Sequence, residues 1–523
     1  MTPTLRSPGT VSKRLPLLGL LGLTAYGLTA CAPRGPATPP IVTAGVGGPT
    51  TGAGATPTLA FTPCMLTHPT RLASLKAECA TLEVPENPSG EGRRITLSIV
   101  RDPAISERKA PDPLFILAGG PGMGAQEMYT GTAAAFARIG RDRDIILVDQ
   151  RGTGRSTPLV CDLDAEGDWL KDAAPTPSAI DAEARTCLDK LAARHDVRQY
   201  TTSVAVRDLE AVRRTLGVER INLYGVSYGT RVAQAYLRRH PDHVRSVILD
   251  GVVPPGLALG PAIATNAEVA LARILKRCAA QPACRSAFGD PAATYRSLVA
   301  RLRAAPQEVR LPDPRTGELR TLRFGHRHLA AVLRLSSYSA MQASLLPVAL
   351  HEAATKDDFT PLAASLLMLH DSLVSSIATG MHYSVVCTED VPFAGVVDRA
   401  RLEATYMGAE TMDTLQRVCA LWPRGPMDAD FRKPLTSAVP VLLLSGADDP
   451  VTPPAYGEAA LRGLADARHV VLAGEGHGQL GAPCMDKVLR DFLDTAQPST
   501  LDLKCLDQRA AAPFFTSLAG PAP

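Results

Sequence analysis

Aromatic residues are scarce in this chain, at 5% of 523 residues with only 2 tryptophans, and neither sign of charge dominates. Lys and Arg number 55 against 52 Asp and Glu, so the formal charge is +3, which gives no reason to expect nucleic acid as a partner. Only one apolar run approaches the length of a membrane span, which argues against a multi-span membrane protein. Hydrophobic residues at 45% and charged residues at 20% are typical of a folded globular chain and argue against intrinsic disorder.

The cysteines show no metal-binding spacing, because neither Cys-x-x-Cys nor a compact Cys/His cluster occurs. We therefore expect no metal, and no motif calls for a cofactor. Of the 11 cysteines, Cys31 belongs to an N-terminal motif and ten remain, at positions 64, 79, 161, 187, 278, 284, 387, 419, 484 and 505. In an oxidising compartment they predict up to five disulfides, and sequential pairing is simplest because each pair then lies within one local segment. Buried free thiols are the alternative.

The N-terminus has the pattern of an export signal. Three basic residues precede an uncharged apolar stretch at 15–30, which leads into Leu-Thr-Ala-Cys31. This tetrad resembles the bacterial lipobox, in which the cysteine is acylated and becomes the first residue of the mature protein. We expect residues 1–31 to be a lipoprotein signal with its acceptor cysteine, and the mature protein to be exported and anchored in the lipid bilayer of a bacterial cell envelope. An uncleaved anchor, or a plain signal peptide giving a secreted or periplasmic protein, is the alternative.

The pattern of strands and helices predicts an α/β fold. Residues 32–60, rich in Pro, Gly, Thr and Ala with a single charge, predict a flexible tether. Eight short runs then predict strands that alternate with helices and form a mostly parallel sheet covered on both faces. These runs are 80–84, 95–101, 114–118, 145–148, 221–224, 247–250, 441–444 and 470–472. We expect core segments at 61–254 and 436–510, with a helical cap at 255–435 inserted between strands six and seven.

A Gly-x-Ser-x-Gly pentapeptide, centred on Ser227, lies between a predicted strand and a predicted helix. The glycines suit a sharp, strained turn that would present the Ser227 hydroxyl above the sheet. An incidental serine flanked by glycines is the alternative.

A serine nucleophile needs a base and an orienting carboxylate, which in this fold type follow in the order Ser, Asp or Glu, His. His477 follows the last strand in a glycine-rich loop, and Asp449 follows strand seven, both at the sheet edge where α/β active sites form. Asp449 is preferred over Asp448 because Pro450 fixes the turn there, but Asp448 remains a rival. A surface-loop role for His477 is the alternative.

Gly119-Gly120-Pro121-Gly122 follows strand three and could supply backbone donors to an oxyanion. We expect the N–H groups of Gly120 and Tyr228 to form that pair. An ordinary strand-to-helix turn is the alternative.

Three motifs together resemble the secreted prolyl- and tripeptidyl-aminopeptidase branch of the α/β hydrolases, with its TAP-like C-terminal region. They are Gly-Gly-Pro-Gly at 119–122, Asp-Gln-Arg-Gly-Thr-Gly-Arg-Ser at 149–156 and Gly-Val-Ser-Tyr-Gly-Thr at 225–230. The similarity runs from about Cys64 to Cys505. One departure is Ala118, where related prolyl aminopeptidases usually carry His, and this speaks against strict proline specificity. The resemblance implies release of one to three residues from a free N-terminus.

Such an enzyme must recognise an ammonium group, which calls for a carboxylate in the cap. In the family, an acidic residue just after Cys387 resembles the anchor of the amino terminus, which implies Glu389 here, with Asp390 beside it. Solvated loop charges are the alternative. A bond between Cys387 and Cys419 would tie this segment to the run entering strand seven.

The leading hypothesis for function is therefore a serine aminopeptidase that acts on short peptides through an acyl-enzyme on Ser227. An esterase or amidase acting on small acyl compounds is the second hypothesis, because fold and triad do not choose the substrate. A binding lipoprotein of the envelope without catalysis is the third, and the intact Ser/Asp/His set argues against it.

Overall fold

The computed structural model describes residues 41–43, 59–68, 73–161, 175–314, 316–374, 376–508 and 511–521. The expected signal peptide, Cys31 and most of the expected tether lie outside these residues. Within the tether, however, Ile41–Thr43 form strand β1, which pairs in parallel with Thr81–Glu83. All three residues of β1 are β-branched and favour extended structure, so here the prediction of a flexible tether differs from the structure.

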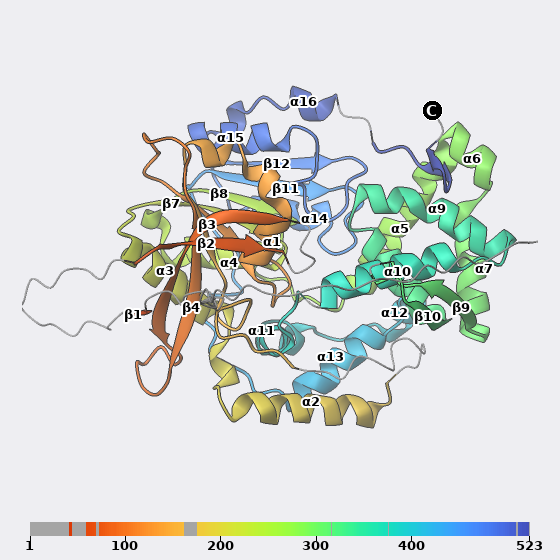
Figure 1. Ribbon diagram of the computed structural model, residues 1–523, viewed down its shortest axis with the longest axis horizontal. Coiled ribbons are helices and arrows are strands. Elements are labelled where there is room, and N and C mark those ends of the chain that lie inside the picture. The colour runs from red at the N-terminus through yellow and green to blue at the C-terminus, as the bar shows by residue number, and fades with distance from the viewer. Residues whose placement is uncertain are drawn as a thin grey trace, which may run out of the picture. The chain divides into compact units, whose positions relative to one another are not determined.

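The eight expected strands are present in one mostly parallel sheet (Figure 1). They are β3 (Ser74–Pro85), β4 (Arg94–Asp102), β5 (Leu114–Leu117), β6 (Ile145–Val148), β7 (Ile221–Val226), β8 (Val244–Asp250), β11 (Val441–Gly446) and β12 (Ala467–Leu472). The order is β1-β3-β4-β6-β5-β7-β8-β11-β12, in which β6 to β12 run parallel. Strand β2 (Thr62–Thr67), which pairs antiparallel with β3, was not predicted from the sequence. The parallel strands end at one edge, where the loops that follow them meet.

Helices cover both faces of this sheet, as its buried strands require. In β5, Phe115 and Leu117 pack on one face and Leu114 and Ile116 on the other, and all four are buried. The first face is covered by α2 (Pro177–Ala192), α3 (Thr202–Leu216), α4 (Tyr228–Arg239) and α14 (Pro454–Leu461). The second face is covered by α1 (Ala125–Thr132), α15 (Met485–Thr495) and α16 (Lys504–Asp507).

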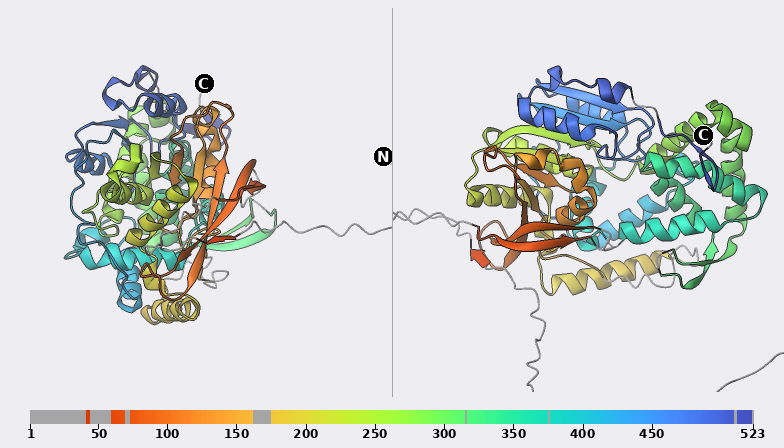
Figure 2. Two further views of the ribbon diagram at one scale, coloured as in Figure 1. Left: turned by 90° about the vertical axis from the view of Figure 1, so that its left-hand side faces the viewer. Right: turned by 45° about the horizontal axis from the view of Figure 1, so that its top comes forward.

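The cap lies between β8 and β11 in the chain, as expected, and consists mainly of helices (Figure 2). Its buried side chains form a hydrophobic core of their own. Its helices are α5 (Ile263–Ala280), α6 (Pro282–Phe288), α7 (Pro291–Ala304), α8 (His326–Ser336), α9 (Ala340–Thr355), α10 (Thr360–Val374), α11 (Thr379–Glu389), α12 (Arg399–Glu403) and α13 (Glu410–Leu421). The cap also contains an antiparallel hairpin of β9 (Gln307–Pro312) and β10 (Leu319–Phe324), which was not predicted from the sequence. The signal was present, because Val309 and Leu311 alternate with exposed polar residues.

The ten remaining cysteines form five disulfides in sequential order, which confirms the predicted pairing. They are Cys64–Cys79, Cys161–Cys187, Cys278–Cys284, Cys387–Cys419 and Cys484–Cys505, with Cα atoms 4.9–6.5 Å apart. The fourth joins α11 to α13 within the cap. Five disulfides indicate an oxidising compartment outside the cytosol.

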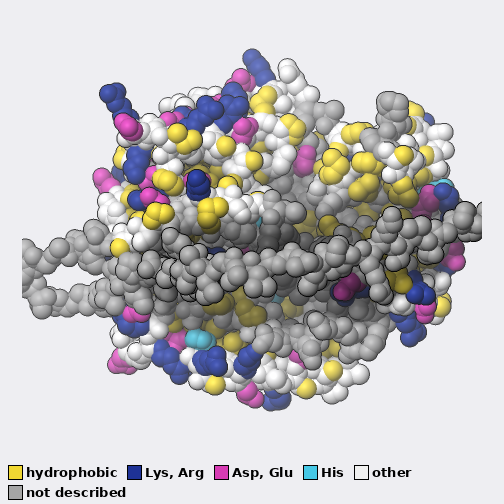
Figure 3. Space-filling view, in the orientation of Figure 1, with side chains coloured by type: hydrophobic (Ala, Val, Ile, Leu, Met, Phe, Trp, Pro, Cys, Tyr) yellow, Lys and Arg dark blue, Asp and Glu magenta, His cyan; other side chains and the backbone are white. Residues whose placement is uncertain are grey.

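Of the helices that the structure describes, none combines the length and the apolarity needed to cross a bilayer. On the face shown in Figure 3, basic and acidic side chains are interspersed among the residues drawn in colour. The last described segment forms a small hairpin of β13 (Phe515–Ser517) and β14 (Gly520–Pro521).

Candidate active site

Ser227 occupies a sharp turn between β7 and α4. Its φ of 56° and ψ of −123° lie outside the regions that residues other than glycine normally adopt. The flanking glycines make this turn possible, because a Cβ on Gly225 would collide with the carbonyl of Gly229, and a Cβ on Gly229 would collide with that of Leu117. This is the geometry of a nucleophile elbow, in which a strained serine is presented at the edge of the sheet.

The glycine-rich loop after β5 lies directly against the serine. A Cβ on Gly119 would come within 3.1 Å of the Ser227 Cβ. The next residue, Gly120, is exposed with a φ of 106°, and Tyr228 is the first residue of α4. Neither the N–H of Gly120 nor that of Tyr228 donates a hydrogen bond within the described residues. Both N–H groups are therefore without a partner among the described residues, and they belong to the residues that directly follow Gly119 and Ser227, which lie against each other.

The start of α11 in the cap holds the same loop from its other side. The N–H of Ala378 donates to the carbonyl of Gly122 at 2.9 Å, and Ile377 forms a β-bridge with Met123. One turn further, Nδ1 of His382 lies 3.1 Å from the carbonyl oxygen of Pro121. Burial lowers the pKa of His382. The loop is thus fixed by contacts from both the core and the cap.

His477 and Asp449 form a hydrogen-bonded pair at the ends of β12 and β11. Nδ1 of His477 lies 2.8 Å from Oδ2 of Asp449, whose side chain has no exposed surface. The same carboxylate accepts from the N–H groups of Val451 and Thr452, each at 2.8 Å, and from the Thr452 hydroxyl. A carboxylate held by several donors fixes the tautomer of the imidazole and leaves Nε2 for proton transfer.

Asp448, the rival of Asp449, faces away from the imidazole. Its Oδ2 lies 3.3 Å from Nη2 of Arg277 in the cap helix α5. The structure therefore places Asp449, and not Asp448, against His477.

Ser227 and His477 both lie against the segment at the end of β8. The Ser227 N–H donates to the carbonyl of Asp250 at 2.8 Å, and a Cβ on Gly251 would lie 3.1 Å from Cε1 of His477. No hydrogen bond of the Ser227 hydroxyl occurs within the described residues. Such bonds are often loose without substrate and tighten in the complex.

The Asp250 carboxylate is a feature that the sequence analysis missed. It is fully buried and accepts from the Tyr224 hydroxyl at 2.7 Å and from the Gln479 N–H at 2.8 Å. Burial raises its pKa to about 6. Asp250 could have been selected from the sequence, because it lies at the carboxyl end of a parallel strand, where α/β active sites form.

The charges around His477 shift the pKa of its imidazole. Burial alone would lower the pKa of His477, but the charge of Asp449 and their hydrogen bond, with Asp250 beyond, outweigh burial and raise the pKa above its ordinary 6.5. Burial would raise the pKa of Asp449, but His477 and the N–H groups of Thr452 and Val451 lower it. The Asp449 carboxylate therefore stabilises the protonated form of His477 relative to an isolated imidazole.

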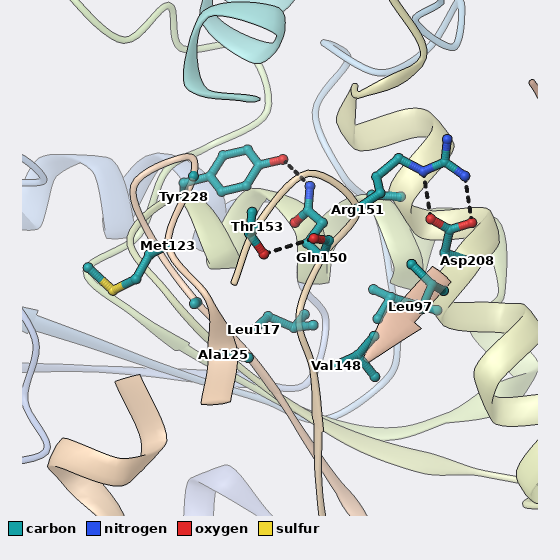
Figure 4. Close-up of a pocket in the computed structure, with 15 residues that line it drawn as sticks. Leu97, Leu117, Met123, Ala125, Val148, Gln150, Arg151, Thr153, Asp208 and Tyr228 are labelled. Atoms are coloured by element: carbon teal, nitrogen blue, oxygen red, sulfur yellow. Dashed lines mark hydrogen bonds and ion pairs between the residues drawn. The ribbon is translucent and has the colours of Figure 1, made fainter. Parts of the chain in front are cut away.

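The 149–156 motif contacts Tyr228, the residue after Ser227, and helix α3 (Figure 4). Arg151 is buried and donates hydrogen bonds from Nε and Nη2 to the Asp208 carboxylate of α3. The Gln150 amide donates to the Tyr228 hydroxyl at 3.0 Å. The carboxylate of Asp149 accepts from the backbone N–H groups of Gln126 and Arg155. The cavity lined by Gln150, Arg151, Asp208 and Tyr228 is ≈ 10 Å³, about the space of one water, so the motif packs closely against the residue that follows Ser227.

Glu389 and Asp390 end helix α11 inside the protein, and both are fully buried, so they are not solvated loop charges. Glu389 accepts from the Thr202 N–H at 2.7 Å and from the Thr202 hydroxyl at 2.9 Å. Asp390 pairs with Nη2 of Arg231 at 2.9 Å, and Glu389 lies 3.7 Å from Nη1 of the same guanidinium. Arg231 could not be selected from the sequence, because its partners lie some 160 residues away and only the fold brings them together.

One group of side chains among the described residues has a metal-like arrangement: Glu210, His240 and His243, whose ligand atoms lie within 4.8 Å of one another. The guanidinium of Arg213 already forms a bidentate ion pair with the Glu210 carboxylate, with nitrogens 2.6 and 2.8 Å from its two oxygens. A cation there would have to displace that guanidinium, so the arrangement fits an ion pair better than a metal site.

Comparisons with known proteins agree with this geometry. One family model, described as alpha/beta hydrolase fold, matches residues 112–276, and a second, described as TAP-like protein, matches residues 404–505. Carboxylesterase B of Mycobacterium tuberculosis is 30% identical over 465 residues, which cover 82% of this chain and 86% of that protein.

Two further relatives are named as peptidases. Serine protease Hip1 of Mycobacterium tuberculosis is 29% identical over 425 residues, covering 75% of this chain and 80% of that protein. Tripeptidyl aminopeptidase of Streptomyces lividans is 30% identical over 198 residues, covering 34% and 36%. These matches confirm the resemblance seen in the three motifs: the chain belongs to the α/β hydrolases, and it is a serine hydrolase.

Proposed function

We propose that the protein is a serine exopeptidase that releases one to three residues from the free N-terminus of short peptides. The observation that carries this proposal is the strained Ser227 turn beside the hydrogen-bonded pair of His477 and Asp449, which offers a nucleophile, a base and a group to orient the base. The relatives named as a serine protease and a tripeptidyl aminopeptidase support a peptide as the substrate.

In this mechanism His477 removes the proton of the Ser227 hydroxyl as that oxygen attacks the scissile carbonyl. Asp449 holds the imidazole in the required tautomer and stabilises its positive charge. The N–H groups of Gly120 and Tyr228 donate to the oxygen that becomes negative in the tetrahedral intermediate. His477 then gives the proton to the leaving amine, and water, activated by the same base, hydrolyses the acyl-enzyme.

The pH dependence of kcat/KM follows from the raised pKa of His477. Only the neutral imidazole can take the serine proton, so activity is complete above the pKa of the folded protein and is lost as the pH falls through it. Because Asp449 and Asp250 raise that pKa while Arg334 opposes them, we expect half-maximal kcat/KM on the acid side above pH 6.5. A profile that stays flat between about pH 5 and pH 8 would exclude His477 as the base.

We propose that Glu389, with Asp390 beside it, anchors the substrate ammonium. Two carboxylates share the Arg231 guanidinium. Burial raises the pKa of Glu389 to about 7 against the pull of Arg231, so a further positive charge would stabilise its ionised form. The Thr202 hydroxyl contacts both Glu389 and the Tyr228 hydroxyl, which connects this acidic pair to the residue next to the nucleophile.

Glu389→Gln keeps the side-chain volume and removes the charge. A charge-assisted hydrogen bond contributes about 1.5–3 kcal/mol, so kcat/KM on a free-amine peptide anilide should fall about ten- to a hundredfold. A simple acyl ester has no ammonium and should lose little. The measurement is kcat/KM on both substrates for wild type, Glu389→Gln and Asp390→Asn. Equal losses on the two substrates would show that Glu389 is structural.

An esterase or amidase acting on small acyl compounds is the second candidate, favoured by the similarity to carboxylesterase B. The two functions are separated by hydrolysis of aminoacyl- and tripeptidyl-anilides, the same compounds with the amine acetylated, and simple acyl esters. A peptidase of the proposed kind loses activity when the amine is blocked. Hydrolysis of the esters alone, or of blocked and free anilides equally, would favour the second candidate.

We also propose that the mature protein is anchored in the bacterial cell envelope through acylated Cys31. The support is the Leu-Thr-Ala-Cys tetrad, together with five disulfides that indicate export. Mass spectrometry of the mature N-terminus tests the proposal, and an unmodified Cys31, or a mature chain without it, would refute it.

A further inference from the structure

Arg334, near the end of cap helix α8, differs from the buried arginines of the core. Arg143, Arg151 and Arg231 each lie 2.6–3.1 Å from a carboxylate oxygen. Within the described residues Arg334 forms no ion pair, and its one hydrogen bond runs from Nη2 to the Tyr338 hydroxyl at 3.2 Å. Its Nε is buried without any hydrogen-bond partner. Most of the five N–H donors of this arginine therefore have no acceptor among the described residues.

Tyr338 connects this arginine to the proposed catalytic base. The Tyr338 ring meets the His477 imidazole edge-on with centroids 5.1 Å apart, and the guanidinium lies 6.0 Å from the centre of the same ring. The backbone N–H of His477 donates to the Tyr338 carbonyl at 2.9 Å. Arg334 therefore lies on the His477 side of the site.

The charge of Arg334 acts on groups at both borders of the site. It opposes the rise in the pKa of His477, and on the other border it adds to the lowering of the pKa of His382, which contacts the glycine-rich loop. Among the described residues Arg334 is thus a cation without an ion-pair partner, and it lies beside His477 through Tyr338.

We propose that Arg334 binds a carboxylate of the substrate on the leaving-group side of the scissile bond. This inference rests on the proposed function and narrows its substrates to short peptides in which the residue after the scissile bond is anionic. His477 delivers its proton to the leaving amine, and Arg334 lies near His477 through Tyr338, so we assign the anion to the leaving-group side. The planar fork of a guanidinium matches a carboxylate, and pairing in a half-buried site forms strong charge-assisted hydrogen bonds.

The carboxylate could be the C-terminus of a single leaving residue or the acidic side chain of that residue. Three free-amine peptides with the same first residue X distinguish them: X-Ala, X-Ala-amide and X-Asp-amide. We expect wild type to prefer X-Ala over X-Ala-amide about ten- to a hundredfold in kcat/KM, mostly through KM. Preference for X-Asp-amide over X-Ala-amide would identify the side chain as the source instead.

Arg334→Gln should bring the ratio of kcat/KM for the acidic and neutral peptides to about one, and Arg334→Lys should restore part of it. The control is Arg327→Gln on the same helix, where Arg327 pairs with Glu410 at 2.8 Å. This control should keep the wild-type ratio. Two results would overturn the proposal: a wild-type ratio of kcat/KM near one, or a preference for the acidic peptide that persists in Arg334→Gln. The wild-type ratio can be measured even if Arg334→Gln does not fold.

Failure of the peptidase function is a separate outcome. If wild type hydrolyses no free-amine peptide, the proposed function is wrong, and the role of Arg334 is then tested on 4-carboxyphenyl and 4-carbamoylphenyl esters of one acid. The same ratio, with the same loss in Arg334→Gln, would uphold the anion site. Equal rates on the two esters would refute it.

Discussion

Replacing Ser227 by alanine should lower kcat by about 10⁴-fold or more and leave the fold intact. The substitution removes one oxygen atom and no other, and this hydroxyl forms no hydrogen bond within the described residues. Its backbone φ of 56° is held by contacts that the variant keeps, among them the hydrogen bond of the Ser227 N–H to the Asp250 carbonyl and the close fit of Gly225 and Gly229. The loss should therefore be one of chemistry and not of structure.

The measurement is kcat on the best substrate of the panel, with circular dichroism and the thermal midpoint as checks of the fold. Thr230→Val is a useful contrast, because the Thr230 hydroxyl accepts from the Val253 N–H at 2.8 Å and donates to the Ser227 carbonyl. That variant should lose stability more than Ser227→Ala does. Turnover above a few per cent of wild type in purified Ser227→Ala would mean that another residue is the nucleophile.

Asp449→Asn should cost about as much as loss of the serine, on the order of 10⁴-fold in kcat, while Asp448→Asn should be mild. An amide at position 449 can donate through its nitrogen and so favours the wrong tautomer of His477, whose Nδ1 lies 2.8 Å from the carboxylate in the native protein. Asp448 contacts Arg277 instead, at 3.3 Å, and its loss removes a contact between core and cap.

The two variants have the same change of chemistry at neighbouring positions, so each is the control for the other. Kinetics on one substrate, together with thermal unfolding, separates the effect on catalysis from the effect on stability. Asp448→Asn should change the unfolding midpoint more than it changes kcat. The reverse ranking of kcat would assign the orienting acid to Asp448.

The buried parallel strands were predictable because each is a short, nearly continuous apolar run, as in Leu114–Leu117 and Ile145–Val148. The β9–β10 hairpin has the alternation of a half-buried strand, but each of its strands contains few buried residues and the helical patterns around it are stronger, so it was not predicted. Strand β1 was missed because it contains just Ile41–Thr43 within a segment rich in Pro and Gly. Its pairing with β3 depends on a tertiary contact.

The same distinction applies to the site. The placement of Ser227, Asp449 and His477 at one sheet edge follows from a rule about strand ends, so local sequence was enough to select them. Arg231 and Arg334 could not be selected this way. Their significance depends on which carboxylates do or do not reach them, and those carboxylates belong to distant segments. The burial of Glu389 at the end of α11 was equally invisible in sequence.

The order of the disulfides bears on how the exported chain can mature. Taken in chain order, the ten cysteines from Cys64 to Cys505 are bonded two by two, with separations of 15, 26, 6, 32 and 21 residues. A chain that enters an oxidising compartment from its N-terminus therefore presents the two members of each pair before either member of the next. Short loops also close at the lowest entropic cost, so the native partner is the first available and the nearest. Maturation of this protein can then proceed with a simple thiol oxidant and makes little demand on a disulfide isomerase.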